Sequence, residues 1–196
     1  MKVVTITGSV GTGKTTLAKK LSKKLNYLYI DVNKIVKENK LDREYDKKRK
    51  CYVVDIKKLN RSLVKIINNY KKSIKNEFNK TNSIKKLKKI KKGIIIDSHL
   101  SHYLPKKYVD LCIVTKCGLK ELQRRLKKKK YDKDKIRENL DCEIFNVCFN
   151  EAREAGHKVV VINTTKIPKG FLSILKQNVS KATKGLNINA IFNKIK

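Results

Sequence analysis

The chain has 196 residues, of which 40% are apolar, and both values describe a globular protein large enough to bury a core. Its 50 Lys and Arg residues outnumber its 17 Asp and Glu residues, so that the formal net charge is +33. No run of about 18 apolar residues occurs and the first residues read as a strand, which argues against a membrane span and a secretory signal. We expect a cytoplasmic monomer with one domain over residues 1–196 and no membrane partner.

The excess of positive charge indicates a polyanionic partner, of which RNA is the commonest. A lysine-rich proteome is the alternative explanation, because Lys, Asn and Ile are all abundant in this chain. The five cysteines form no Cys-x-x-Cys pair, and they lie mostly among apolar residues. This pattern is typical of reduced, buried thiols and does not indicate a zinc site.

Residues 8–15 read Gly-Ser-Val-Gly-Thr-Gly-Lys-Thr and match the phosphate-loop pattern G-x-x-x-x-G-K-[ST]. A strand rich in β-branched residues is predicted over 2–7, and a helical apolar pattern begins at Leu17. In this setting the backbone N–H groups would point at the phosphate chain of a nucleotide, Lys14 would reach its β- and γ-phosphates, and the Thr15 hydroxyl would bind Mg²⁺. A glycine-rich turn that only caps a helix is the alternative.

The next elements are a short strand over 27–32, a charged segment with scattered aromatic residues over 33–54, and a helix over 55–70. Asp55 is well placed to cap the start of that helix. Residues 71–92 are rich in lysine and poor in apolar side chains. We expect either a solvated extension of the helix or a partly disordered basic arm.

Three further strands are predicted over 94–97, 111–115 and 158–163, each an apolar run rather than an alternating one. Helices are expected over 119–127, from Asp132 to Gly156, and near 171–179. The helix that begins after Asp132 carries an apolar stripe made of Ile136, Leu140, Ile144, Val147, Cys148 and Ala155.

Strands that are apolar on both faces and alternate with helices predict a parallel sheet covered on both sides. The predicted fold class is therefore α/β, a three-layer P-loop NTPase fold with a five-stranded parallel sheet.

A second acidic residue, Asp97, ends the predicted strand over 94–97. In phosphate-loop enzymes an acid in this place orders the water shell of the magnesium ion, although an Asp can also simply cap a turn. His99 would project from the same strand end, where it either positions a water and senses the γ-phosphate or only makes a hydrogen bond within the loop.

Three segments together resemble the adenylate kinase isoenzyme 6 family. They are Gly-Thr-Gly-Lys-Thr-Thr at 11–16, Asp-Ser-His at 97–99, and the stretch from Tyr131 through Lys-Ile-Arg-Glu-Asn at 135–139 to Glu143-Ile144. The resemblance covers roughly residues 1–155. It implies an adenylate-kinase-like body with a short lid, which acts as a kinase-like ATPase in late maturation of the small ribosomal subunit. AMP, a platform ribosomal protein and rRNA are the partners that it implies.

The resemblance also implies roles for individual residues. ATP contacts would come from Gly11, Gly13, Lys14, Thr15 and Thr16, and the catalytic set would be Lys14, Asp97 and His99. Magnesium would bind to Thr15 directly and to Asp97 through water.

The resemblance further places a monophosphate-binding region at 31–54 and the lid at 128–138. The family usually carries Arg-Gly ahead of Tyr131, whereas this chain has Lys129-Lys130, so that Lys129 would take the place of the lid arginine. Lysine keeps the charge but lacks the planar fork of arginine. The family does not account for the lysine-rich insertion at 71–92, and the tail at 186–196 shows no readable pattern.

Three functions remain open on these grounds. The first is phosphoryl transfer from ATP to a nucleoside monophosphate, for which Arg43 and Arg49 are candidate grips on the acceptor. The second is an ATP-switched ribosome assembly factor that hydrolyses ATP, which His99 and the net charge favour. The third, a basic RNA-binding module with a vestigial phosphate loop, is disfavoured because every polar position of the loop is intact.

Overall fold

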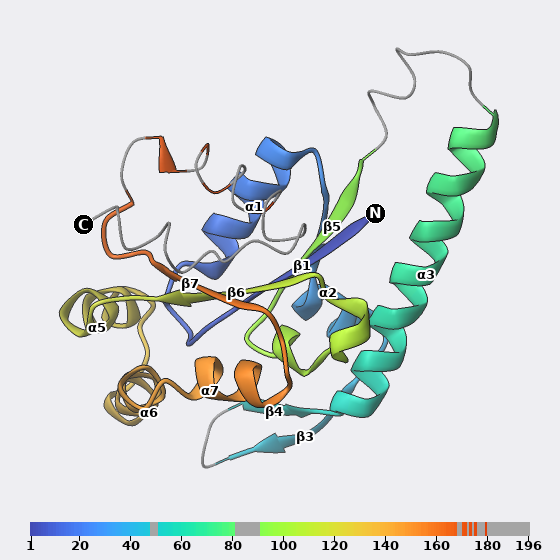
Figure 1. Cartoon of the computed structure of the whole chain (residues 1–196). Helices are drawn as coiled ribbons and strands as arrows, with labels where there is room; N and C mark the ends of the chain where they lie inside the picture. Colours follow the sequence, from blue (N-terminus) through green and yellow to red (C-terminus); the bar gives the residue numbers. More distant parts are fainter. Residues whose placement is uncertain are drawn as a thin grey trace.

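The computed structural model of the chain describes residues 1–47, 51–80 and 91–167, together with positions 170, 171, 173, 175 and 179. Its centre is a sheet of five parallel strands in the order β2-β5-β1-β6-β7 (Figure 1). The strands are β1 (Lys2–Thr7), β2 (Leu28–Asp31), β5 (Gly93–Asp97), β6 (Leu111–Lys116) and β7 (Val159–Asn163). The predicted five-stranded parallel sheet is therefore confirmed.

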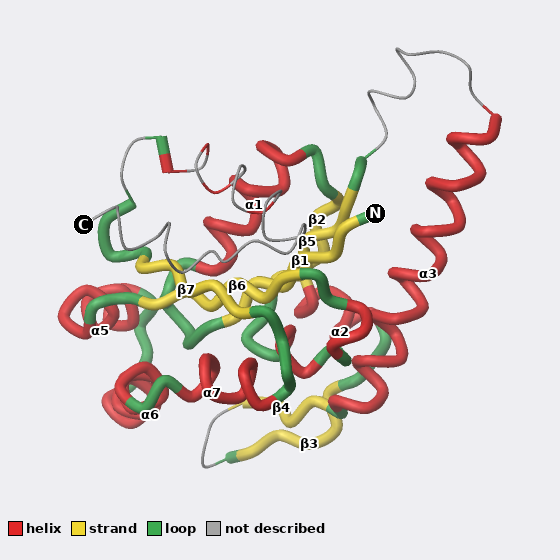
Figure 2. The backbone as a smooth tube through the Cα atoms, viewed as in Figure 1, coloured by secondary structure: helices red, strands yellow, loops and turns green. Residues whose placement is uncertain are grey.

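Helices cover both faces of this sheet (Figure 2). They are α1 (Lys14–Leu25), α2 (Val32–Glu38), α3 (Ile56–Lys80), α5 (Leu119–Lys128), α6 (Lys133–Ile144) and α7 (Val147–Glu154), with 3-10 turns η1 (Ser101–Tyr103) and η2 (Lys106–Tyr108). An antiparallel pair, β3 (Asp42–Asp46) and β4 (Cys51–Val54), lies outside the main sheet. The charged composition of 33–54 gave no sign of this hairpin, whose strands pair only with each other.

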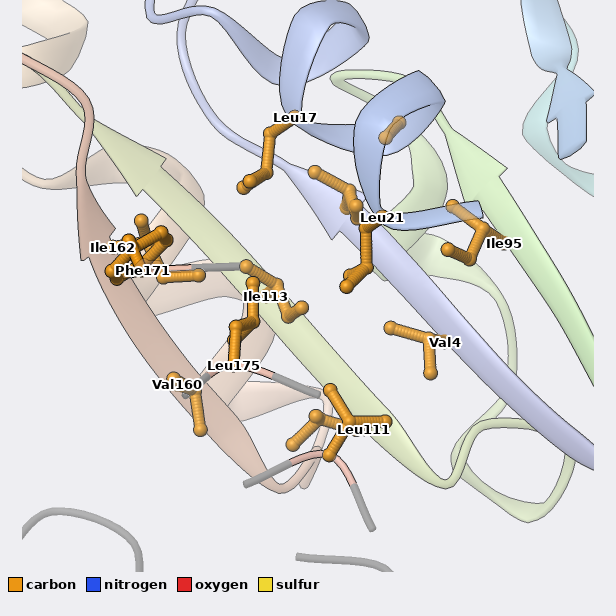
Figure 3. Close-up of a cluster of buried hydrophobic side chains, with 13 residues drawn as sticks. Val4, Leu17, Leu21, Ile95, Leu111, Ile113, Val160, Ile162, Phe171 and Leu175 are labelled. Atoms are coloured by element: carbon orange, nitrogen blue, oxygen red, sulfur yellow. The ribbon is translucent and has the colours of Figure 1, made fainter. Parts of the chain in front are cut away.

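One face of the sheet packs against α1. Leu17 and Leu21 of this helix are buried against Val4 and Ile113 of the central strands (Figure 3). The predicted helix near 171–179 falls on the same face, where its described positions are helical and the side chains of Phe171, Leu175 and Val179 join the core.

The opposite face packs against α3 and α7. Leu59, Leu63 and Ile67 of α3 are buried in one cluster with Ile94 and Ile96 of β5. Further along the sheet, Ala152 of α7 packs against Cys112 and Val114 of β6. Adjacent residues of one strand thus enter different cores, which is why the strands are apolar along their whole length and why the fold has three layers.

The prediction of one continuous helix from Asp132 to Gly156 is wrong, because this stretch forms two helices. Asn146 stands between α6 and α7 with φ of 54°, a left-handed conformation that ends a helix. The two halves bury their apolar sides against different partners, since Ile136 packs on α5 whereas Ala152 packs on the sheet. Ile144, expected within the apolar stripe, is 49% exposed at the break.

Both predicted N-caps are confirmed. The Asp55 carboxylate accepts a hydrogen bond from Lys58 N at 3.1 Å, and the Asp132 carboxylate accepts one from Lys135 N at 2.8 Å. Of the lysine-rich insertion, residues 71–80 extend α3, as one of the two alternatives predicted, whereas 81–90 and the tail at 186–196 lie outside the described residues.

Two composition-based expectations can be compared with the fold. The four cysteines whose side chains are described, Cys112, Cys117, Cys142 and Cys148, are free thiols. Within the described ranges, no helix combines the length and the apolar character needed to cross a membrane.

Lys130 has a backbone conformation that favours glycine. Its φ is 60°, and it follows Lys129, the C-cap of α5. A left-handed residue is a common way to end a helix, and a side chain there clashes with its own backbone. The family that the sequence resembles usually carries glycine at this position. This chain keeps the turn with a lysine, whose backbone is strained at positive φ.

We expect Lys130→Gly to raise the free energy of unfolding by about 1 kcal/mol, because glycine adopts positive φ without a clash. Urea titrations of the two proteins would measure the change. Lys20→Gly, in the middle of α1, is the matched control and should lower stability by about 1 kcal/mol. A Lys130→Gly protein that is no more stable than the parent would contradict the assignment of strain.

Candidate active site

The loop between β1 and α1 has the curled backbone that phosphate binding requires. Gly8, Gly11 and Gly13 all have positive φ, at 136°, 89° and 85°. Gly13 also serves as the N-cap of α1, so that the N-terminal N–H groups of this helix open onto the loop. This is the arrangement that the motif at 8–15 predicts, with the partial positive charge of the helix aimed at an anion.

A cavity of about 850 Å³ opens beside the loop. Its walls include every residue predicted for the site: Gly11, Gly13, Lys14, Thr15, Thr16, Asp97, His99 and Lys129. These residues come from the loop, from the end of β5 and from the end of α5. The carboxyl ends of neighbouring parallel strands meet at one sheet edge, which brings Asp97 and His99 next to Lys14.

Asp97 presents one free carboxylate oxygen to this region. The side chain is buried, and its Oδ2 accepts a hydrogen bond from the Tyr29 hydroxyl at 2.9 Å. Its Oδ1 is also buried but has no hydrogen-bond partner among the described residues. A buried carboxylate oxygen without a donor needs a cation or a water to compensate its charge, and oxygen donors are those that Mg²⁺ prefers. Together with the Thr15 hydroxyl on the cavity wall, it forms a donor set that suits magnesium.

Lys14 and His99 are both shifted towards their neutral forms. Burial lowers the pKa of Lys14 to about 8, and its ammonium group donates to Ser9 O at 2.9 Å. Burial, followed by repulsion from Lys14, lowers the pKa of His99 to about 4. His99 is therefore a neutral imidazole at pH 7, able to accept a hydrogen bond from a water.

Glu143 holds the phosphate loop in place from behind. Its Oε2 accepts a hydrogen bond from the Ser9 hydroxyl at 2.9 Å, and its Oε1 accepts one from Cys117 N at 2.8 Å. Both contacts are buried, and they tie α6 to the loop and to the end of β6. The sequence analysis gave Glu143 no such role. The sequence held one signal of this role. Glu143 stands seven residues after Ile136, so that its carboxylate falls on the predicted apolar stripe, where a charged group needs a partner.

Arg125 is a second residue that sequence reasoning missed. It lies on the cavity wall, and its guanidinium donates to Gly11 O at 3.4 Å and to Thr164 O at 2.9 Å. Glu121 accepts a hydrogen bond from Arg125 Nε at 2.7 Å and fixes the orientation of the group. The ionised form of Glu121 is favoured by Arg124 and Arg125, whose hydrogen bonds lower its pKa to about 2.

The comparisons with known proteins show the family of the chain. The sequence model of the AAA domain family matches residues 4–146. The chain is 33% identical over 158 residues to the adenylate kinase isoenzyme 6 homolog of Caenorhabditis elegans, an alignment that covers 81% of this chain and 76% of that protein. The homolog of Schizosaccharomyces pombe is 30% identical over 180 residues, covering 92% and 89%. The chain belongs to the adenylate kinase isoenzyme 6 family.

Family membership supports nucleotide kinase activity. The fold itself also occurs in other proteins. The structure is similar to an unliganded sugar kinase from Janibacter sp. HTCC2649, with a TM-score of 0.56 and 13% sequence identity, over 93% of this chain and 98% of that one. This likeness shows the shared α/β fold alone.

The predicted monophosphate-binding region and the predicted lid contribute unequally to the cavity. From the region at 31–54, Asn33 of α2 lines the wall, and from the lid at 128–138 Lys128, Lys129 and Tyr131 do so. Arg43 forms an ion pair with Asp55 and is absent from the cavity wall. Arg49 lies outside the described residues.

We expect Glu143→Ala to lower the free energy of unfolding by about 3 kcal/mol and to raise the KM for ATP, because a buried hydroxyl and a buried N–H lose a charged acceptor. Urea unfolding and steady-state kinetics measure the two effects. Glu154→Ala, an exposed carboxylate on α7, is the matched control and should stay within about 0.5 kcal/mol of the parent. Parental stability and KM in Glu143→Ala would show that the loop does not depend on this contact.

A second prediction concerns proton uptake by Lys14. With a pKa of about 8 in the free protein, part of the Lys14 population is neutral at pH 8.5. A bound polyphosphate favours the ammonium form and raises this pKa, so that ATP binding should take up a proton and weaken as the pH rises above 8. Calorimetry at pH 8.5 in two buffers of different ionisation enthalpy measures the uptake. Lys14→Arg, which stays charged, is the control, and heats that do not depend on the buffer in the parent would refute the mechanism.

Proposed function

We propose that the protein is an ATP-dependent adenylate kinase that transfers the γ-phosphoryl group of ATP to AMP and that also hydrolyses ATP. The observation that carries the proposal is the convergence of the phosphate loop, Asp97, His99 and Lys129 on one cavity. Phosphoryl transfer requires positioning and charge neutralisation more than covalent chemistry, and this cavity offers both.

The residues of the loop would hold the phosphates. Backbone N–H groups around Gly11 and Gly13 and the first turn of α1 would donate to the phosphate oxygens, with Thr16 at the edge of the same wall. The Lys14 ammonium would leave the Ser9 carbonyl, its acceptor in the free protein, and contact the β- and γ-phosphates. Its positive charge would stabilise the charge that develops on the transferred group.

Magnesium, when bound, supplies further neutralisation of the charge on the β- and γ-phosphates. The residues that would hold it are Thr15 through its hydroxyl and Asp97 through water at the free Oδ1. Tyr29 donates to the other Asp97 oxygen and keeps the carboxylate in a fixed orientation. Asp97→Asn would therefore weaken magnesium binding more than nucleotide binding.

The acceptor would enter from the region at 31–54, whose Asn33 lines the cavity, and the lid at 128–138 would close over ATP with Lys129 and Tyr131. Closure excludes water, which would otherwise intercept the phosphoryl group. Arg125 is well placed to assist, since it has the planar guanidinium that Lys129 lacks.

A second candidate function is an ATP-switched factor in late maturation of the small ribosomal subunit, located in the cytoplasm and bound to a platform ribosomal protein and rRNA. Two observations favour it. A neutral His99 beside Asp97 can position a water for hydrolysis, which a dedicated monophosphate kinase does not need. The net charge of +33 suits a polyanionic partner such as rRNA.

The test measures ADP formed from ATP and AMP, and phosphate released from ATP alone, for the parent and for His99→Ala. We expect the parent to form ADP with AMP well above the hydrolytic rate, and His99→Ala to lose about 100-fold in hydrolysis but less than about 10-fold in transfer. Lys14→Met is the control and should lose both activities. The absence of AMP-dependent ADP from the parent would refute the kinase, and equal losses of both activities in His99→Ala would refute the role of His99.

A further inference from the structure

Helix α3 carries a row of positive charges along one side. Its members are Lys57, Arg61, Lys65, Lys72 and Lys75, which we call the α3 basic stripe. At 3.6 residues per turn these five positions fall within about 80° of one another around the helix axis and extend over about 27 Å along it. All five side chains are exposed.

The stripe lies opposite the side of α3 that packs on the sheet. Leu59, Leu63 and Ile67 are buried in the core, and their mean direction is about 120–180° away from the members of the stripe. Asn68 and Asn79 are exposed on the same side as the stripe and add hydrogen-bonding amides to it. Because the apolar side is already used by the core, the polar side is the one available to a partner.

The charges of the stripe are not compensated within the described part of the chain. Glu77 is the one acidic residue of α3, and it lies about 120–200° from the stripe around the helix. On α5 and α6 several cations pair with carboxylates, as Arg125 does with Glu121 and Arg137 with Asp141. None of the described ion pairs includes a stripe residue.

The outer part of α3 stands away from the protein body (Figure 1). Beyond Tyr70 the described side chains are exposed, apart from the half-buried Ile74. Packing on the sheet therefore does not explain why the helix continues past this point. The extension of the helix beyond Tyr70 does place Lys72 and Lys75 where a large partner can reach them.

We propose that the α3 basic stripe binds the phosphate backbone of double-stranded RNA, and this partner rests on the proposed role in maturation of the ribosomal subunit. A rigid row of lysine and arginine side chains suits contacts that do not depend on base sequence, and amides add donors for phosphate and 2′-hydroxyl groups. The stripe contains no aromatic residue, so that it lacks the stacking surface that single strands use. A membrane surface fits poorly, since an interfacial helix must insert an apolar side, which α3 buries in the core.

The experiment compares the full-length parent with a variant in which all five stripe residues are changed to Gln. The binding of both to a 20-base-pair RNA duplex is measured by fluorescence anisotropy at a series of salt concentrations. If the five cations contact phosphates, the variant should lose at least about tenfold in affinity, and the slope of log affinity against log salt should decrease by about 4. The matched control removes five exposed lysines elsewhere, Lys23, Lys24, Lys37, Lys106 and Lys120, and should change the slope by less than about 1.

Each outcome of the experiment has a distinct reading. If the stripe variant binds RNA no worse than the control variant does, the proposal that the stripe binds RNA is overturned, whereas RNA association of the protein is not. A parent that does not bind the duplex overturns the stripe together with the proposed RNA partner, and unchanged adenylate kinase activity in the same preparation keeps the kinase proposal separate. Tighter binding to vesicles of phosphatidylserine and phosphatidylcholine than to RNA would also overturn it. Circular dichroism of the variant must match the parent, because all five substitutions are on the solvent side.

Discussion

The phosphate loop has to curl its backbone around an anion, and the rest of the structure depends on keeping that shape. Contacts within the loop, such as the hydrogen bond from the Thr12 hydroxyl to Ser9 O at 2.7 Å, are joined by contacts from segments far along the chain. A Cβ at Gly8 would lie 2.4 Å from Thr115 O, which shows how closely β6 approaches the loop. The Thr12 hydroxyl meets that of Thr115 at 2.7 Å, and Glu143 holds Ser9. The curled backbone is therefore a product of the sheet, α5 and α6 together.

The same packing sets the electrostatics of the cavity. Asp97 ends β5 and His99 follows it, so that both residues lie at the carboxyl edge of the sheet. Burial removes water from Lys14 and His99 and disfavours their charged forms. A negatively charged nucleotide would reverse this effect for Lys14. The site is thus adapted to an anionic ligand, and a neutral His99 remains available for water.

The positive charges of α5 and α6 differ from those of α3 in what surrounds them. On α5 and α6 the arginines pair with carboxylates three or four residues away, a surface arrangement of modest energetic value. On α3 the cations have no such partners among the described residues and form one row opposite the core. A uniformly lysine-rich composition accounts for the number of positive charges in the chain. It does not account for the row on α3, which depends on the positions of the cations along that helix.

Local patterns in the sequence were sufficient for the fold class, the five strands, the two N-caps, the phosphate loop and Asp97. Each of these depends on neighbours a few positions apart: a glycine pattern at 8–15, an apolar run that ends in Asp97, and an Asp ahead of a helix. The β3–β4 hairpin, the break at Asn146 and the contacts of Arg125 and Glu143 required the tertiary structure. Ser9 and Glu143 are 134 positions apart, and the packing of α6 against α5 brings the carboxylate to the loop. The sequence by itself determined the phosphate-loop motif, because its pattern is local, and the fold decided which distant residues hold that loop in place.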